Sequence, residues 1–251
     1  MKIFHYSEMK FFIFQFLFNL NKKKIKDFHS HFIFQFKIKT MILEFLEQIN
    51  KKKIILGSKS PQRRMIFDMT GIKYEVQASK FEENLDHSAF PTPIDYVKAN
   101  AIGKTTEVAT RFPDADLIIG CDTVLYYDGK ILEKPEDADE ARRTLRMLSG
   151  DVHQVISVVC LCYPTSLVDG KPIVQIFEDI SEVHFIEMTD AFIEKYIESG
   201  KWVEQAGSYH MQDTFSPIFI KKINGCYWNA IGFPCAKFCE KLMEVAKDHW
   251  F

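Results

Sequence analysis

The stretch from Lys51 to Arg64, KKKIILGSKSPQRR, changes abruptly from an apolar run to a loop of small, polar and basic residues. Its apolar part, 54–56, predicts a short buried strand. A serine followed by a proline, at 60–61, is typical of a helix start, because the hydroxyl caps free N–H groups and proline suits the first helical position. Such a helix terminus, with serines and Arg63 beside it, can bind a phosphate or carboxylate. An ordinary strand-to-helix turn with a solvated basic face is the alternative.

The composition limits what the chain can be. Of its 251 residues 47% are hydrophobic, enough to bury a core as one domain or two closely packed lobes. Residues 1–40 hold eight lysines against Glu8 and Asp27, a net charge of +6, so residues 41–251 carry −8 and the whole chain −2. An acidic main body argues against a nucleic-acid surface. Six cysteines without a C-x-x-C pair predict reduced thiols in a cytoplasmic protein.

Residues 1–40 differ in composition from the rest, with ten phenylalanines and no arginine, proline or glycine. The apolar run 11–20 is too short to span a bilayer, and no small-residue cleavage site follows it, so we expect no membrane attachment. Because A/T-rich DNA also encodes such a composition, we expect Met41 to be the natural start. The predicted domains are an N-terminal extension, 1–40, that is disordered, loosely helical or a gene-model artefact, and one folded domain, 41–251.

Strands and helices alternate over the folded domain. Capping residues, prolines and apolar faces predict helices that start near Met41, Pro61, Thr92-Pro93, Glu136, Thr189 and Pro234. Apolar and β-branched runs predict strands at 54–56, 74–77, 117–121, 153–163 and 173–185. Asp128-Gly129 and Asn224-Gly225 predict hairpin turns, the second joining strands 218–223 and 226–230. The predicted fold class is α/β, with a mixed twisted sheet and flanking helices.

The run Ser58-Lys-Ser60-Pro61-Gln62-Arg63 resembles the S-x-S-P-R-R signature of the Maf family of nucleoside triphosphate pyrophosphatases. Further fragments match in the same order, namely Lys80-Phe-Glu-Glu83, Lys104, Gly120-Cys-Asp122-Thr123-Val124, Glu133-Lys134-Pro135, Leu148-Ser149-Gly150, Ala206-Gly-Ser-Tyr209-His-Met-Gln212 and Ile231-Gly-Phe-Pro234. The resemblance covers roughly residues 54–245. It implies two lobes around a central nucleotide cleft, as in inosine-triphosphatase-like proteins, and often a homodimer.

Two carboxylates are the candidate acids of the site. Asp122 follows the apolar run 118–121, which predicts a position at the carboxyl end of a buried strand, where open α/β sheets bind ligands. A carboxylate that caps the next turn is the other reading, and the resemblance decides for a general base that activates water. Glu83 is the expected partner, and the two together would bind a divalent cation, Mg²⁺ or Mn²⁺. Taken alone, Glu82 and Glu83 read as a solvated charge pair.

Three cations and two serines are expected to bind the triphosphate. The resemblance assigns Lys104 and Lys134 to catalysis and Ser58, Ser60 and Arg63 to the substrate. By position alone, a lysine in mid-helix usually faces solvent, and a lysine after a hairpin strand usually lies in a loop. Arg64 has no such support and is expected at the surface.

Base preference is where the chain departs from the family. The branch of the family that prefers dTTP and UTP has arginine, threonine and glutamine at the positions of Gln62, Thr123 and Gln212, so two of three residues agree. The branch that acts on 7-methyl-GTP differs at all three. An amide such as Gln212 can pair with the donor and acceptor edge of a pyrimidine. His210 and Asp213 stand where glycines are usual.

The predicted reaction is hydrolysis of dTTP and UTP, with modified pyrimidine nucleotides as further candidates, between the α and β phosphates. The products are a nucleoside monophosphate and pyrophosphate, a house-cleaning role. A catalytically weakened nucleotide-binding regulator of cell division and a pyrophosphatase of another base class, such as 7-methyl-GTP or inosine triphosphate, are the alternatives. Neither a nucleic acid nor a membrane is an expected partner.

Overall fold

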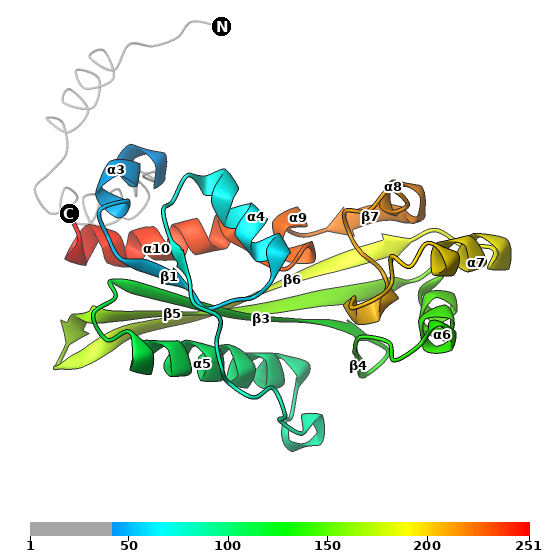
Figure 1. Cartoon of the computed structure of the whole chain (residues 1–251), viewed down its shortest axis with the longest axis horizontal. Coiled ribbons are helices and arrows are strands. Elements are labelled where there is room, and N and C mark those ends of the chain that lie inside the picture. The colour runs from blue at the N-terminus through cyan, green and yellow to red at the C-terminus, as the bar shows by residue number, and fades with distance from the viewer. Residues whose placement is uncertain (1–41) are drawn as a thin grey trace, which may run out of the picture. The chain divides into compact units, whose positions relative to one another are not determined.

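The computed structural model describes residues 42–251 (Figure 1), and the predictions for residues 1–40 and for Met41 as the natural start lie outside them. The helices are η1 Ile42–Phe45, α3 Leu46–Ile49, α4 Pro61–Thr70, η2 His87–Ala89, α5 Pro93–Arg111, α6 Ala138–Leu148, α7 Asp190–Glu198, η3 Ala206–Ser208, α8 Ser216–Phe219, α9 Tyr227–Ala230 and α10 Cys235–His249. No helix among these residues is long and apolar enough to cross a membrane.

The strands form one mixed seven-stranded sheet, so the predicted α/β class is confirmed. They are β1 Ile54–Leu56, β2 Glu75–Val76, β3 Leu117–Tyr127, β4 Lys130–Leu132, β5 Val152–Val168, β6 Lys171–Phe185 and β7 Ile220–Asn224. The order is β2-β1-β3-β5-β6-β7, with β4 paired to β3. Strands β2, β1 and β3 run parallel, and the other pairs are antiparallel.

Local sequence signals account for the ends of the main helices. The side chains of Ser60, Thr92 and Thr189 each accept a hydrogen bond from a backbone N–H three residues later, as the sequence predicts. Helix α4 ends at Gly71, whose φ of 73° suits a residue without a side chain. The hairpin at Asp128-Gly129 is also confirmed, because β3 and β4 pair on either side of it.

The two faces of the sheet carry different helices, and α5 lies opposite α4 and α10 (Figure 1). Alternate residues of β3 show the division, because Leu117 and Ile119 pack in the cluster that includes α4 and α10, while Ile118 packs against Val108 of α5. A second large hydrophobic cluster includes residues of α6, α7 and α8, at the end of the sheet where β4 and β7 lie.

Strand β3 is longer than the sequence predicts. The strand does not end after the apolar run 117–121 but continues to Tyr127. Asp122 therefore lies in the middle of a strand, paired with Val158 of β5, and the prediction of a strand end is wrong. The cause is β5, which offers a long antiparallel partner along the whole of β3. Asp122 therefore points from one face of the sheet instead of lying in a loop beyond it.

The predicted hairpin at Asn224-Gly225 is wrong as well. Asn224 ends β7, which pairs with β6, and the chain then enters the short helix α9 instead of a strand. The Ser181 hydroxyl on β6 explains the difference, because it donates to Cys226 O at 3.0 Å and accepts from Cys226 N at 3.1 Å. The N–H and C=O groups of Cys226 are therefore bonded to a side chain and not to a neighbouring strand.

Candidate active site

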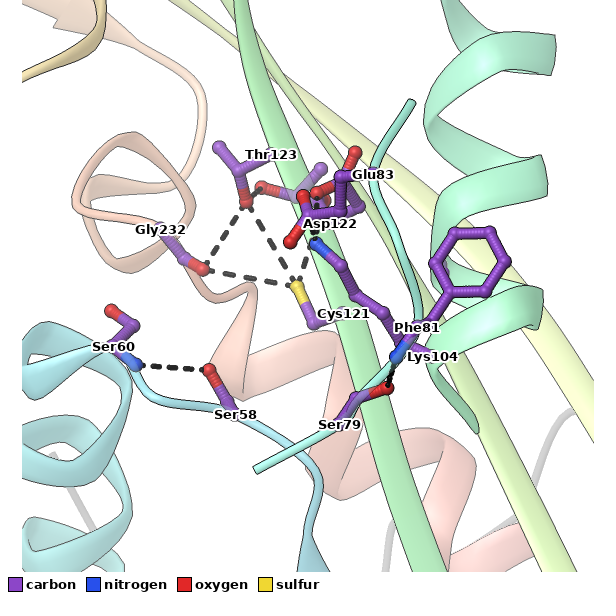
Figure 2. Close-up of polar contacts among 12 residues, drawn as sticks. Ser58, Ser60, Ser79, Phe81, Glu83, Lys104, Cys121, Asp122, Thr123 and Gly232 are labelled. Carbon is purple, nitrogen blue, oxygen red and sulfur yellow. Dashed lines mark hydrogen bonds and ion pairs between the residues drawn. The ribbon is translucent and has the colours of Figure 1, made fainter. Parts of the chain in front are cut away.

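Three charged side chains from separate segments meet beside β3. The Nζ atom of Lys104, on α5, lies 2.6 Å from Glu83 Oε2 and 2.7 Å from Asp122 Oδ1. Lys104 and Asp122 are 8% and 7% exposed, whereas the Glu83 side chain is 56% exposed. Figure 2 shows the amine between the two carboxylates. Lys104 is thus buried, unlike most mid-helix lysines, because two carboxylates compensate its charge.

Close packing brings these segments together. A Cβ atom at Gly120 would lie 2.0 Å from Thr105 Oγ1, so only glycine lets β3 approach α5 so closely. The Phe81 ring packs on Gly103 in the same way, since a Cβ there would lie 2.4 Å from it. This contact holds the segment before Glu83 against α5, one residue from Lys104.

The alternation of β3 divides the candidate residues between two faces. Asp122 points to the α5 side, like Gly120, and meets Lys104 there. Cys121 packs in the cluster around α4 and α10 on the other side, and Thr123 shares its face by the same alternation. A single strand thus presents the Asp122 carboxylate on one face and the Thr123 hydroxyl on the other.

Arg63, on α4, occupies that second face. Its Nε donates to Gly232 O at 3.0 Å, one terminal nitrogen donates to Cys121 O at 2.9 Å, and the other donates to Thr123 Oγ1 at 3.0 Å. A further contact reaches Ser58 Oγ at 3.3 Å. The guanidinium therefore joins β3, the loop before α10 and the signature loop, residues 57–60 between β1 and α4. Its expected contact with substrate stays a prediction.

The two serines lie at the N-terminus of α4. Ser58 is buried, and its Oγ accepts from Ser60 N at 3.2 Å, while Ser60 Oγ accepts from Arg63 N at 3.4 Å. Figure 2 shows both serines on the signature loop. Pro61 has no N–H group and the Arg63 N–H is capped by Ser60, so the two hydroxyls and the Gln62 N–H are what this terminus offers to an anion.

Lys134 stands apart from this group. Its side chain is 60% exposed, and its Nζ lies 2.7 Å from Glu204 Oε2. The hydrogen bond from Lys134 lowers the pKa of the Glu204 carboxyl. Among the described residues, no contact joins Lys134 to Lys104, Glu83 or Asp122, so its catalytic role stays a prediction.

The three residues expected to recognise the base, Gln62, Thr123 and Gln212, already have hydrogen-bond partners within the protein. The Thr123 hydroxyl is engaged with Arg63, Ser157 and Gly232 O. Gln212 is exposed, and its Nε2 lies 3.5 Å from the Tyr227 hydroxyl. Gln62 lies in the first turn of α4, between Ser60 and a residue from a distant segment, His210. Of the three, Gln212 is the best placed to change partners.

Some residues of this region carry no signal that sequence reasoning could use alone. Ser157, on β5, is fully buried and contacts Thr123 at 2.9 Å. Gly232 lies in the matched run 231–234 and has a φ of 112°, which suits glycine, but its sequence does not reveal that its carbonyl accepts from Arg63. Cys121 is also buried, and burial raises the pKa of its thiol, so it lacks the thiolate that a nucleophile needs.

Glu83 and Asp122 are the two carboxylates that could bind a divalent cation. Among residues 42–251 there is no group of three or more His, Cys, Asp or Glu side chains that could hold a metal ion. Mg²⁺ nevertheless keeps several waters and needs one or two carboxylates together with phosphate oxygens. Glu83 and Asp122 converge on one amine and so fit this smaller requirement.

Comparison with known proteins places the chain in a class. Residues 53–245 match the family model for Maf-like proteins, and the chain belongs to this family. A "Nucleoside triphosphate pyrophosphatase" of Dictyostelium discoideum is 36% identical over 189 residues, which are 74% of this chain and 87% of that protein. A "dTTP/UTP pyrophosphatase" of Bacillus cytotoxicus is 35% identical over 193 residues, 77% of this chain and 95% of that protein.

A human protein, "Probable bifunctional dTTP/UTP pyrophosphatase/methyltransferase protein", is 35% identical over 202 residues. These residues are 77% of this chain but only 32% of the human protein, so the chain spans about a third of its length. A solved HAM1 protein from Coxiella burnetii aligns over 78% of this chain and 99% of that chain at 14% identity. Its TM-score of 0.36 is too low to carry an argument.

Proposed function

We propose that the protein hydrolyses nucleoside triphosphates, dTTP and UTP before others, to the nucleoside monophosphate and pyrophosphate. The observation that carries this is the meeting of Glu83, Lys104 and Asp122. Asp122 follows Cys121, whose carbonyl is joined through Arg63 to Ser58 at the start of α4. The relatives named as dTTP/UTP pyrophosphatases support the substrate class.

Asp122 is the proposed general base. Lys104 donates to its Oδ1, which fixes the carboxylate and leaves Oδ2 to accept a proton from the attacking water. Because Asp122 is almost fully buried, the water it activates would be held close to it. Mg²⁺ or Mn²⁺, when bound by Glu83 and Asp122, would neutralise phosphate charge and acidify a coordinated water.

Phosphate binding falls to the signature loop in this proposal. Ser58, Ser60 and the Gln62 N–H would hold phosphate oxygens, and Lys134 would leave Glu204 to meet the departing pyrophosphate. Gln212 would exchange its Tyr227 contact for the pyrimidine edge. The homodimer, the cytoplasmic location and the absence of nucleic-acid and membrane partners stay predictions.

The test is pyrophosphate release by the purified full-length chain from a panel of triphosphates, with Mg²⁺, with Mn²⁺ and with a chelator. We expect release from dTTP and UTP, its loss on chelation, and a decrease of at least about a hundredfold in Asp122→Asn. Equal melting temperatures would show that the variant is folded. Nucleotide binding without release from any triphosphate would refute the hydrolase and favour the regulator.

A further inference from the structure

Two residues that stand out in the sequence contact each other in the fold. Gln62 Nε2, in the first turn of α4, lies 3.1 Å from His210 Nε2, across 148 positions of sequence. Both side chains are half-buried. Helix α4 packs through Ile66 and Phe67 in one large hydrophobic cluster, while Tyr209, next to His210, packs in the other. The contact therefore joins segments that belong to different parts of the core.

The backbone of His210 is held on both sides. Its N–H donates to the Tyr196 hydroxyl at 3.1 Å, and its carbonyl accepts a hydrogen bond from Ser216 Oγ. Tyr196 in turn donates to Asp213 Oδ2 at 2.7 Å, and Asp213 Oδ1 accepts from Ser216 N at 2.8 Å. Asp213, the second unusual residue of this segment, thus anchors the first.

The hydrogen bonds of the His210 ring have a direction. Its Nδ1 accepts from Gln212 N at 3.0 Å. A neutral imidazole has one acceptor nitrogen, so Nε2 carries the proton and donates to Gln62. Of the two ends of the Gln62 amide, only the oxygen can accept this proton. The oxygen and nitrogen of an amide exchange places by a half-turn about its last bond, so we assign the oxygen to the position next to the ring.

The direction of these hydrogen bonds also determines what Ser60, at the start of α4, can donate to. In the structure Ser60 Oγ lies 3.1 Å from Gln62 Oε1. After the half-turn that places the amide oxygen on the ring, the NH₂ group takes this position and donates to Ser60 Oγ. Ser60 Oγ also accepts from Arg63 N, so both of its lone pairs are used and its own proton is free to donate. A phosphate oxygen is the acceptor that the α4 terminus suits.

We propose that Gln62 and His210 form a latch that couples recognition of the base to recognition of the phosphates. The latch links the backbone of Gln212, through His210 and Gln62, to the hydroxyl of Ser60. Its two members are positioning residues, which act through Gln212 on the base and through Ser60 on the phosphate. The ligand class is a pyrimidine nucleoside triphosphate with an N3–H and carbonyl edge, and the proposal rests on the function proposed above.

The first test is a double-mutant cycle on the full-length chain with Gln62→Met, His210→Phe and both together. The readouts are kcat/KM for UTP and for CTP, and binding of the non-hydrolysable probe α,β-imido-UTP. We expect each single change to weaken UTP binding and kcat/KM about tenfold, and the double change to do no more, because both remove one contact. The preference for UTP over CTP should fall by a similar factor, while exposed Thr214→Ala, in the same segment, should change neither.

The latch would be overturned if the losses of kcat/KM in the two single variants multiplied in the double variant while the preference for UTP over CTP stayed unchanged. A second measurement does not depend on turnover: long-range ¹H–¹⁵N NMR of the histidine rings. We expect the His210 signal to report a proton on Nε2 in the unchanged chain and to shift in Gln62→Met. A proton on Nδ1, or no response to Gln62→Met, would refute the latch even if the protein hydrolyses UTP, and the expected result would stand even if it does not.

Discussion

The two faces of β3 differ in how their polar groups are satisfied. On the α5 side, Lys104 is buried between two carboxylates, one of which, Glu83, is largely open to solvent. On the other side, Arg63 is held by two carbonyl and two hydroxyl oxygens of the protein itself. One strand thus serves two different groups of side chains. On one face is a cluster of opposite charges whose outer member can exchange partners, and on the other is the Arg63 cation, whose neutral acceptors are already occupied. The first face is suited to chemistry, and the second to holding the site in shape.

Lys104→Met is expected to have the largest effect. The change leaves Asp122 buried without its cation, and breaking a buried pair in this way costs about 3 kcal/mol of unfolding free energy. Pyrophosphate release should fall at least about a hundredfold, because the general base loses its orientation. Urea denaturation and release assays measure both effects. The control is Lys98→Met on the exposed side of α5, and equal effects of the two would contradict the role given to Lys104.

Arg63→Lys probes the other face while keeping the positive charge. A lysine cannot reproduce the planar fork that reaches Gly232 O, Cys121 O and Thr123 Oγ1, so we expect a loss of about 2 kcal/mol in stability. Activity should fall about tenfold, and the main cause should be a less ordered signature loop. Arg64→Lys, at an exposed position of the same helix, is the matched control. A variant as stable as this control would show that the network contributes little.

His153, unlike Lys104, is buried against a neutral partner. Its Nε2 lies 2.7 Å from the Tyr209 hydroxyl, and its Nδ1 has no hydrogen-bond partner among the described residues. Burial lowers the pKa of His153 from 6.5 to about 4, with nearby His184 adding to the effect and Asp151 opposing it.

The unfolded chain therefore binds a proton at His153 below about pH 6.5, while the folded chain does not until about pH 4. Folding stability should fall as the pH drops through this window, by roughly 2 kcal/mol between pH 6.5 and 5. Denaturant titrations at several pH values measure the slope. In His153→Gln, whose amide does not titrate, the slope should be smaller by about one proton, and an unchanged slope would contradict the assignment.

Glu83→Gln should have the smallest effect on stability. Its side chain is 56% exposed, so loss of the ion pair with Lys104 should cost less than about 1 kcal/mol. Catalysis should suffer more, by about tenfold, if Glu83 holds the metal and substrate in place. Glu82→Gln, one residue earlier and also exposed, should leave both quantities unchanged. Loss of stability without loss of activity would make Glu83 a structural residue.

Much of this protein follows from local sequence. The strand, serine loop and capped helix from 54 to 70 form as predicted, because burial of an apolar run, a hydroxyl cap and a terminal glycine act over a few residues. The α/β class and the first hairpin follow for the same reason. The motif residues Asp122, Glu83 and Lys104 are also recognisable without a structure, although their contacts are not.

Other features depend on partners that are distant in sequence. The length of β3, and with it the direction in which Asp122 points, depends on pairing with β5. The failed hairpin at Asn224-Gly225 depends on Ser181 of β6, and the burial of Lys104 depends on segments on both sides of it.

From sequence alone follow the α/β class and the capped helices, because those signals are local and periodic, and the motif resemblance identifies the candidate residues. Only the tertiary structure decided which face of the sheet each residue serves, that Arg63 is bound by the protein, and that Gln62 meets His210. The physical reason is that pairing across the sheet and packing between distant segments select among conformations that each local segment allows equally.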